Sequence, residues 1–409
     1  MVVDWTISPF RLMASLARDS VHPKDAPGLP YIGLEHIGEG TLQLVGTEVA
    51  EDATSLKSRF RTGDILFGKL RPYFRKVIKA PFDGMCSTDI WVVRPKPGVD
   101  AGFLFYLMAS DLFMEPVVRA SEGTKMPRAR WEYAETLTLP LPPLPDQQAI
   151  AHILGMLDDK IELNRKMNQT LEAMARAIFK SWFVDFDPVR AKAEGRWPRG
   201  ASLPGLPADM WDRFPSEFQE SELGPVPKGW RIATIGDACL FAYGKALKEE
   251  LRQPGIVPVF GSNGQVGWHD AALVRGPGII VGRKGNPGVV TWSQDDFFPI
   301  DTTFYVIAKS VASVPYLLFT LKDAYLGRLE SDSAVPGLNR DAAQSVLSLI
   351  PPAEVVAGFD EAAEHLLELV ALSDKQSRTL AAIRDTLLPK LISGEIRVPD
   401  AEKIASAAT

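Results

Sequence analysis

The sequence predicts an α+β fold with the order globular unit, long helix, globular unit, long helix. Three observations support this prediction. The chain contains an internal repeat, each copy ends in a long run of apolar residues spaced alternately by four and three, and each copy mixes strand-like and helical segments before that run. With 409 residues, of which 46% are hydrophobic, the chain is long enough for two units with their own cores.

The repeat emerges when the chain is aligned with itself. Residues 63–72, GDILFGKLRP, align with residues 277–286, PGIIVGRKGN, at an offset of 214. After a five-residue deletion the offset becomes 209, and the pair that begins at Pro142 then aligns with the pair that begins at Pro351. Self-similarity over such a length predicts two copies of one structural unit.

Each copy continues after its Pro-Pro pair into the 4-3 spacing that is typical of a coiled-coil seam. The predicted apolar seam residues are Ile150, Leu154, Leu157, Ile161, Leu171, Ile178, Phe359, Leu366, Val370, Leu380, Leu387 and Leu391. Asn164 and Asn168 interrupt the first run where Ser373 and Ser377 interrupt the second. We therefore predict two helices of roughly 40 residues, about 60 Å long, that pair with each other. The alternative is two separate bundles in which each helix buries its stripe locally.

The segment between the copies differs in composition. Residues 184–229 hold seven prolines and five glycines, which predicts an extended connector without regular structure. The predicted divisions are a globular unit at 1–143, a helix at 144–183, the connector at 184–229, a globular unit at 230–352, a helix at 353–394 and a C-terminal tail at 395–409. Neither globular unit shows the regular strand–helix alternation of a doubly wound sheet.

The stretch GDILFGKL, residues 63–70, comes within one residue of a phosphate-binding loop, because only Leu70 stands where that motif requires Ser or Thr. Such a loop needs backbone that can turn successive N–H groups inward, whereas Ile65, Leu66 and Phe67 form a strand-like run. The second copy keeps the apolar run, a glycine and a cation, but it has Pro277 in place of the first glycine. We predict a buried strand that places a basic side chain at its end.

Charge is unevenly distributed along the chain. The net charge is −6, yet residues 57–80 contain eight cations and one acid, a net charge of +7 that leaves −13 for the rest. Aromatic residues lie among these cations, which favours a nucleic-acid surface over an ordinary solvated face.

Two cysteines, Cys86 and Cys239, are too few for a disulfide scaffold or a Cys-based zinc site and are typical of a reducing compartment. No apolar run is long enough for a membrane span, and Asp4 and Arg11 interrupt the start where a signal peptide has its apolar core. We therefore expect a cytoplasmic protein.

The order of motifs resembles the specificity subunit of type I restriction–modification enzymes over nearly the whole chain. The first unit and helix carry GDILFGKLRPYFRKV, STDIWVVRPK, EGTKMPRARWE and LPPLPDQQAIAHIL, and the second unit and helix carry PVFGSNGQVGWHD, GIIVGRKGNPGVV, PIDTTFYVI and LLPKLISGEIRV. The resemblance implies two target recognition domains that each read one half of a split double-stranded DNA site, held apart by two antiparallel spacer helices.

The resemblance also implies partners. Two modification subunits would transfer methyl groups from S-adenosylmethionine, and ATP- and Mg²⁺-dependent restriction subunits would cut DNA, so no cofactor or metal is expected in this chain. We find no Asn-Pro-Pro-aromatic motif of adenine methyltransferases, and the five histidines form no pair with metal-ligand spacing on a helix. The alternatives are a DNA-modifying or DNA-cleaving enzyme with unrecognised motifs, and a helical adaptor that binds only protein.

Candidate DNA-binding residues follow from the basic run and from its second copy. Sequence-specific interfaces need cations on phosphates together with Asn or Arg side chains on base edges. The candidates in the first unit are Lys69, Arg71, Tyr73, Arg75, Lys76, Lys125 and Arg128, and those in the second are Ser262, Asn263, Arg283, Lys284 and Asn286. No residue is predicted to be catalytic.

Overall fold

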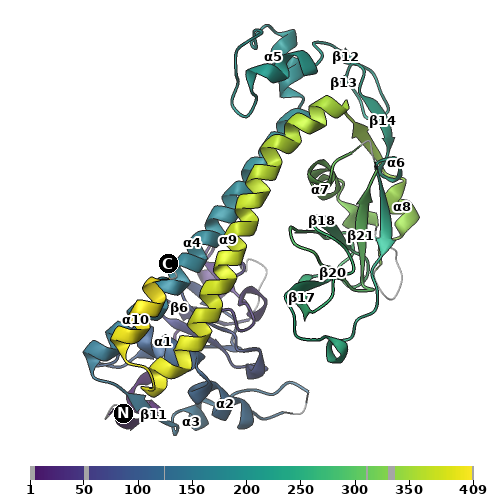
Figure 1. Ribbon diagram of the computed structural model, residues 1–409. Helices are drawn as coiled ribbons and strands as arrows, with labels where there is room; N and C mark the ends of the chain where they lie inside the picture. Colours follow the sequence, from purple (N-terminus) through teal and green to yellow (C-terminus); the bar gives the residue numbers. More distant parts are fainter. Residues whose placement is uncertain (1–4, 50–54, 124, 310–311, 330–336, 408–409) are drawn as a thin grey trace. The chain divides into compact units, whose positions relative to one another are not determined.

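The computed structural model describes residues 5–49, 55–123, 125–309, 312–329 and 337–407. The chain divides into two compact units. Unit 1 consists of Met1–Arg165 and Lys375–Thr409, and unit 2 consists of Lys166–Asp374. Two long helices, α4 (Leu144–Phe183) and α9 (Ala353–Ser393), contribute residues to both units (Figure 1).

Helices α4 and α9 run antiparallel within each unit. In unit 1, Asp158 of α4 forms an ion pair with Arg384 of α9 at 2.7 Å. In unit 2, the ring centroids of Phe179 and Phe359 lie 5.8 Å apart. A later residue of α4 therefore contacts an earlier residue of α9, as expected for antiparallel helices. The predicted pairing of the two helices is confirmed, and the alternative of two separate bundles is wrong.

The buried face of each helix is wider than the predicted seam. Nine of the twelve predicted seam residues are buried, while Leu171, Ile178 and Leu366 are half-buried. The helices also bury residues outside the seam, because each packs on its globular unit as well as on the other helix. They include Ile153, Phe179, Phe183, Leu367, Leu388 and Ile392.

Unit 1 contains two sheets and a helical layer beside α4. The four-stranded antiparallel sheet has the order β2 (Ala14–Leu16), β10 (Ile90–Pro95), β7 (Ile65–Gly68), β8 (Val77–Lys79). The five-stranded sheet has the order β3 (Ser20–Val21), β6 (Lys57–Phe60), β9 (Gly84–Cys86), β4 (Pro30–Ile32), β5 (Glu48–Val49). A separate pair joins β1 (Thr6–Pro9) to β11 (Thr138–Leu141). The remaining helices are α1 (Ala101–Ala109), α2 (Asp111–Arg119), α3 (Trp131–Ala134) and α10 (Val398–Ser406).

Close packing fixes α1 against the start of α4. The Asp100 carboxylate caps α1 by accepting a hydrogen bond from the Phe103 N–H, and the buried Gln147 side chain of α4 accepts one from the Asp100 N–H. A Cβ at Gly102 would lie 2.8 Å from the Ala151 Cβ, so this contact requires a glycine. No single described helix is long and apolar enough to cross a membrane. The bent pair α1–α2 passes that test only jointly, and α1 is buried in this core.

Unit 2 repeats this plan. Its four-stranded antiparallel sheet has the order β15 (Cys239–Tyr243), β21 (Thr303–Ala308), β18 (Gly278–Gly282), β19 (Val290–Ser293). A three-stranded sheet has the order β17 (Gly264–His269), β16 (Val257–Gly261), β20 (Phe298–Pro299). A further pair joins β14 (Arg231–Thr234) to β22 (Leu347–Ile350), and the short helices are α6 (Ile235–Ala238), α7 (Val314–Asp323) and α8 (Arg340–Gln344).

The predicted repeat is therefore present as two copies of one topology. Shifting β11 by 209 residues gives the bounds of β22, and shifting the start of α4 by the same number gives the start of α9. In both units the parallel contact joins equivalent strands, β4 with β9 and β16 with β20. The α+β class is confirmed.

The connector is folded, which differs from the extended segment expected from its composition. It contains α5 (Asp187–Ala193) and the strand pair β12 (Phe218–Gln219) with β13 (Val226–Pro227). Trp197 and Phe214 are buried in the core of unit 2. These aromatic residues supply the buried apolar area that lets the connector fold. The prediction of an extended segment rested on the proline and glycine content and did not take this area into account. The C-terminal tail likewise forms a helix, α10, whose Ala401 and Ala405 are buried in unit 1.

Candidate nucleic-acid interface

The GDILFGKL stretch is a strand, as predicted. β7 pairs with β10 on one side and β8 on the other, so its backbone groups are committed to the sheet and cannot cradle a phosphate. Asp64 is buried, accepts a hydrogen bond from the Arg61 N–H at 2.8 Å and pairs with Arg94 at 2.8 Å. A Cβ at Gly68 would lie 2.9 Å from a Leu34 methyl group, which explains the glycine at the end of the strand.

The end of β7 lies beside a second basic segment of unit 1. The Ala129 N–H donates to the Lys69 carbonyl at 2.8 Å, and the Arg71 N–H donates to the Pro127 carbonyl at 2.7 Å. A β-bridge joins Leu70 to Arg128 between these two bonds. Residues 69–71 and 127–129, which are far apart in the sequence, therefore form one surface, named here the first basic edge.

Arg71 is the most unusual residue of the first basic edge. Its backbone is left-handed, with φ of 52°, a region that non-glycine residues visit at a cost of about 1–3 kcal/mol. Its Nε is buried and has no hydrogen-bond partner among the described residues. A buried donor without a partner costs about 1–3 kcal/mol, so Arg71 adds a second unfavourable contribution to this edge.

Three of the other predicted cations have partners within unit 1. Arg75 donates to Asp111 at 2.6 Å and to the Ala109 carbonyl at 2.9 Å, which ties it to the start of α2. The Lys76 ammonium donates to the Leu34 carbonyl at 2.9 Å. Arg128 pairs with Asp89 at 3.0 Å, and this contact raises the pKa of Arg128. These contacts give Arg75 and Lys76 structural roles, while Arg128 stays exposed.

The remaining candidates of unit 1 face solvent. The Lys125 side chain is exposed, Lys69 is half-exposed, and neither has a hydrogen-bond or ion-pair partner through its side chain among the described residues. Tyr73 is 49% exposed, with its ring centroid 4.7 Å from that of Phe74. An exposed aromatic ring two residues after Arg71 suits contact with a nucleic acid.

Unit 2 brings its candidates together at the equivalent place. Ser262 and Asn263 form the two-residue turn between β16 and β17, and Gly264 takes the positive φ of 102°. A Cβ at Gly282 would lie 3.3 Å from the Ser262 carbonyl oxygen, and one at Gly285 would lie 3.5 Å from its hydroxyl. The turn therefore touches the segment that follows β18. Residues 262–263 and 283–286 are named here the second basic edge.

Backbone contacts of the second basic edge match those of the first. The Leu338 N–H donates to the Arg283 carbonyl at 2.8 Å, and a β-bridge joins Lys284 to Gly337. Lys284 and Asn286 are exposed, whereas Arg283 is half-buried. The Arg283 guanidinium donates to the Asp301 carbonyl at 3.1 Å and stacks 4.8 Å from the Tyr243 ring.

Sequence reasoning missed Tyr243 and Arg340. Tyr243 is 48% exposed at the end of β15, and the Arg340 guanidinium lies 5.4 Å from its ring, so two arginines contact one exposed tyrosine. The three residues are distant in the sequence, and only the order of the strands brings them together. No local motif marks them.

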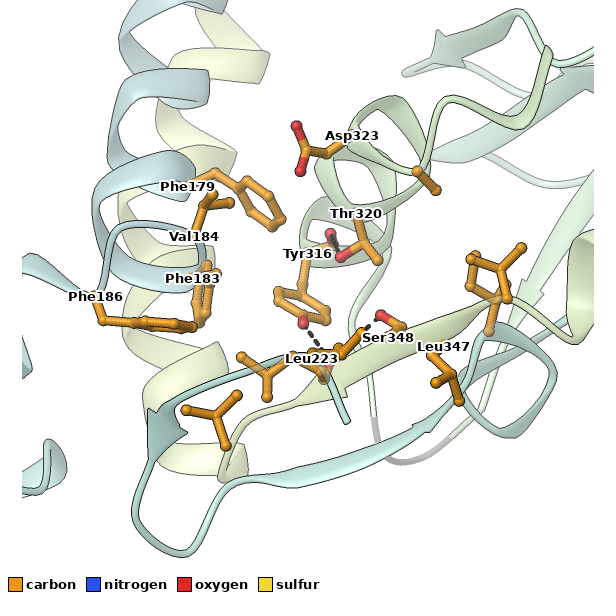
Figure 2. Close-up of a pocket in the computed structure, with 15 residues that line it drawn as sticks. Phe179, Phe183, Val184, Phe186, Leu223, Tyr316, Thr320, Asp323, Leu347 and Ser348 are labelled. Atoms are coloured by element: carbon orange, nitrogen blue, oxygen red, sulfur yellow. Dashed lines mark hydrogen bonds between the residues drawn. The ribbon is translucent and has the colours of Figure 1, made fainter. Parts of the chain in front are cut away.

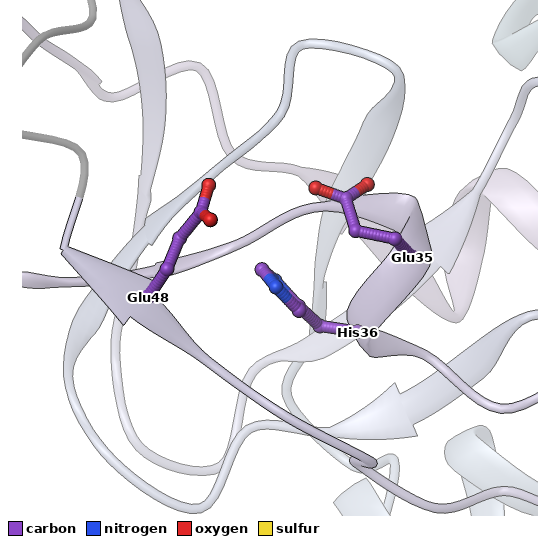
Figure 3. Close-up of side chains that lie close together, drawn as sticks. All are labelled: Glu35, His36 and Glu48. Carbon is purple, nitrogen blue, oxygen red and sulfur yellow. The ribbon is translucent and has the colours of Figure 1, made fainter. Parts of the chain in front are cut away.

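One cluster of Glu35, His36 and Glu48 has the composition of a metal site. Figure 3 shows the three side chains turned toward one another, with potential ligand atoms within 4.8 Å. However, His36 Nδ1 accepts a hydrogen bond from the Gly33 N–H at 2.9 Å. The neutral ring then carries its proton on Nε2, which suits donation to a carboxylate and does not suit a metal.

A pocket of about 280 Å³ lies in unit 2 between the end of α4 and α7. Figure 2 shows Phe179, Phe183 and Tyr316 on its wall. Burial raises the pKa of the Tyr316 hydroxyl, which donates to the Leu349 carbonyl at 2.6 Å. Among the described residues that line it, only Asp323 is charged, so the pocket fits neither a phosphate nor a pair of catalytic carboxylates.

Asp185 and Asp187 lie close to Lys192 in the sequence, a combination of residue types that also occurs in nuclease sites, but all three have structural contacts. Asp185 pairs with Lys180, and Asp187 accepts a hydrogen bond from Ser181 at 2.8 Å. The Lys192 ammonium donates to two backbone carbonyls of the connector, and burial lowers its pKa. Burial raises the pKa of Cys86 and of Cys239 to about 12, so neither thiol is a nucleophile at neutral pH.

Comparison with known proteins finds similar sequences over most of the chain. A model of the type I restriction modification DNA specificity domain matches residues 18–173. The chain is 26% identical to the HindI specificity subunit of Haemophilus influenzae, over 83% of this chain and 88% of the relative. It is 24% identical to the MjaIX specificity subunit of Methanocaldococcus jannaschii, over 93% and 87%. The chain is therefore similar to specificity subunits of type I restriction enzymes over most of its length.

A solved structure has the same fold as this chain. The crystal structure of the S subunit of a type I restriction–modification system from M. genitalium superposes with a TM-score of 0.54 at 17% identity. The match covers 95% of this chain and 96% of that chain. At this identity the match establishes the fold.

Proposed function

We propose that this chain is the DNA sequence-recognition subunit of a type I restriction–modification complex and has no catalytic activity of its own. One structural observation supports this most directly: the same architecture occurs twice, with a buried strand, β7 or β18, that ends in a cation beside a second segment. The relatives that this chain matches over most of their length are specificity subunits. Together with that similarity, the repeated architecture supports two DNA readers in one chain.

The two readers differ in their side chains. The first basic edge presents Lys69, Arg71 and Arg128, whereas the second presents Lys284, Asn286 and the Ser262 turn. A dimer of identical readers recognises a palindrome, so one chain with two different readers suits an asymmetric, bipartite site. The cations would hold phosphates, and the asparagines are suited to base edges.

The state of Arg71 supports a phosphate contact. Its left-handed backbone and its buried, unpartnered Nε carry a cost in the free chain. Once the side chain turns outward, an anionic oxygen at this edge would satisfy the guanidinium donor that no described residue satisfies. The same reasoning gives Arg75 and Lys76 low priority as DNA contacts, because their donors already have acceptors.

The proposal includes partners. Two modification subunits would bind this scaffold and supply methyl transfer with S-adenosylmethionine, and restriction subunits would supply ATP- and Mg²⁺-dependent cleavage. The acidic charge outside the basic run leaves the remaining surface free for protein contacts. Activity on DNA together with these subunits would place the complex in the cytoplasm.

Methylome sequencing of cells that express this chain with its modification subunit tests the proposal. We expect one asymmetric motif made of two half-sites and a gap. Lys284→Ala with Asn286→Ala should relax or weaken recognition of one half-site, and Lys69→Ala with Arg71→Ala should affect the other. Arg119→Ala, which removes an exposed cation outside both edges, is the control. Methylation without a bipartite motif would contradict the proposal.

The enzyme alternative makes a different prediction. A purified chain that consumed S-adenosylmethionine or cut DNA without partners would support it. No observation favours it, since the relatives are specificity subunits and the candidate acids have structural contacts. If the chain were an adaptor that binds only protein, the assembled complex would not bind DNA at any salt concentration.

A further inference from the structure

A carboxylate holds the Arg128 guanidinium at the first basic edge. Arg128 Nε donates to one Asp89 oxygen at 3.0 Å, and Nη2 donates to the other at 3.4 Å. The carboxylate therefore occupies the side of the guanidinium that joins Nε and Nη2. The third nitrogen, Nη1, has no acceptor among the described residues, and the side chain is 48% exposed. The outer N–H groups of Nη1 and Nη2 are left for a ligand.

The backbone fixes both members of this ion pair. Arg128 exchanges two backbone hydrogen bonds with Glu122, at 2.8 and 3.2 Å, and its β-bridge to Leu70 attaches it to the end of β7. The Asp89 carbonyl accepts a hydrogen bond from the Lys69 N–H at 2.9 Å. None of these bonds involves an ionised side chain. Because exposed ion pairs contribute little to stability, support of this segment does not account for the pair.

The second copy of the repeat keeps this backbone and lacks the ion pair. At the offset of 209, Arg128 corresponds to Gly337, and at the offset of 214, Asp89 corresponds to Thr303. The backbone is equivalent, since a β-bridge joins Gly337 to Lys284 in unit 2. Thr303 is buried and its hydroxyl donates to a backbone carbonyl at 2.8 Å. A side-chain pair that only one copy carries is suited to distinguish one half-site from the other.

We propose that Arg128 reads a guanine in one half-site and that Asp89 is the residue that positions it. A guanidinium held along its Nε side presents two parallel N–H groups, which match the O6 and N7 acceptors of guanine in the major groove. The Asp89 carboxylate would repel a phosphate, whereas the acceptors of guanine carry no net charge. Because this role presumes that the chain reads DNA, it rests on the function proposed above.

Methylome sequencing with single variants tests the role of Arg128. Cells express the modification subunit with the native chain, with Arg128→Ala or with Asp89→Asn. The native motif should contain a G·C pair at which the Arg128→Ala complex accepts other bases, while the other half-site and the gap stay the same. Arg119→Ala and Glu115→Gln, which break an exposed ion pair outside both basic edges, are the matched controls and should keep the native motif.

Binding of duplex DNA by the purified complex separates base reading from support of the loop. One duplex carries the native site, and three carry the other base pairs at that G·C position. The native complex should prefer its own site by about 5- to 150-fold, as expected for one bidentate base contact, and Arg128→Ala should lose this preference. Asp89→Asn should lose part of it. It should also raise the salt slope on the substituted duplexes by about one unit, because the released Arg128 can then pair with a phosphate.

The outcomes are distinguishable. An unchanged motif with Arg128→Ala, or relaxation at an A·T pair, would overturn the role of Arg128. Equal weakening on all four duplexes by both variants would show that the ion pair only supports the loop, and would overturn it as well. If Arg128→Ala abolished methylation, the preference measured on the duplexes would decide. A native complex without a bipartite motif would instead refute the proposed function, and this role with it.

Discussion

The Asn168 amide nitrogen of α4 donates to Asp374 of α9 at 2.6 Å, while the oxygen of the same amide is buried and has no hydrogen-bond partner in the part of the chain that the structure describes. Its neighbour Asn164 differs, because its amide donates to both Gln376 and Ser377. Polar layers in an apolar seam set the register at some cost in stability. The two asparagines therefore differ in their hydrogen bonding. The Asn164 amide donates two hydrogen bonds across the helix pair, whereas the Asn168 amide oxygen is an unsatisfied acceptor among the described residues.

We therefore predict opposite effects for the same substitution. Asn168→Leu removes the unsatisfied oxygen and should raise the free energy of unfolding by about 1 kcal/mol, because Asp374 is exposed and can be hydrated. Asn164→Leu breaks two hydrogen bonds and should lower it by about 1 kcal/mol. Urea denaturation of the two variants measures both values. Equal signs would show that the two positions are equivalent.

The first basic edge should contribute to DNA affinity. Lys69→Ala with Arg71→Ala should weaken binding of duplex DNA by the assembled methyltransferase. The slope of log K against log salt concentration should fall by about one unit for each phosphate that is no longer neutralised. Lys76→Ala is the matched control, since its ammonium is held by the Leu34 carbonyl. An unchanged affinity and slope for the double variant would place this edge away from the DNA.

The sequence anticipated elements whose signal is periodic or duplicated. The register shared by the runs from Ile150 and Phe359 was visible because apolar spacing directly reflects helix geometry. The folded connector was not anticipated. Prolines and glycines disfavour regular structure locally, which is visible in the sequence, whereas the burial of Trp197 and Phe214 depends on residues that are distant in the sequence. The intrachain partners of Arg75 and Lys76, and the Tyr243–Arg340 contact, likewise depend on tertiary structure.

The helices should set the gap between the half-sites, since α4 and α9 both contribute to both units. Four residues inserted after Arg165 and four after Asp374 add about 6 Å and rotate the helices by about 40°. The added 6 Å corresponds to the rise of about two base pairs of DNA. The 40° rotation corresponds to the twist of about one base pair. We expect the same half-sites with a gap longer by one or two base pairs in the methylome.

An insertion of the same four residues at the Gly195 turn of the connector is the control and should leave the gap unchanged. It tests whether added length alone alters the site. If the helix insertion changed the half-site bases at a constant gap, the helices would not determine the spacing.

The last prediction concerns Asp360 of α9, which accepts a hydrogen bond from the Ser313 hydroxyl at 2.6 Å. Burial raises the pKa of Asp360 to about 6, and the nearby Glu364 carboxylate adds to the effect. The folded state therefore binds a proton more tightly than the unfolded state. The contribution of this group is fully favourable below its ordinary pKa and is lost as pH rises through about 6.

Asp360→Asn keeps the acceptor for Ser313 and removes the charge. Because Asp360 is only half-buried, solvent reduces the effect, and we expect the variant to be more stable than the native chain by about 1 kcal/mol at pH 8. The gain should vanish near pH 4, where the native carboxyl is protonated in the folded state. Urea denaturation across this pH range measures the difference, with the exposed Glu361→Gln of the same helix as the control. A gain at pH 4 as large as that at pH 8 would rule out ionisation of Asp360 as the cause.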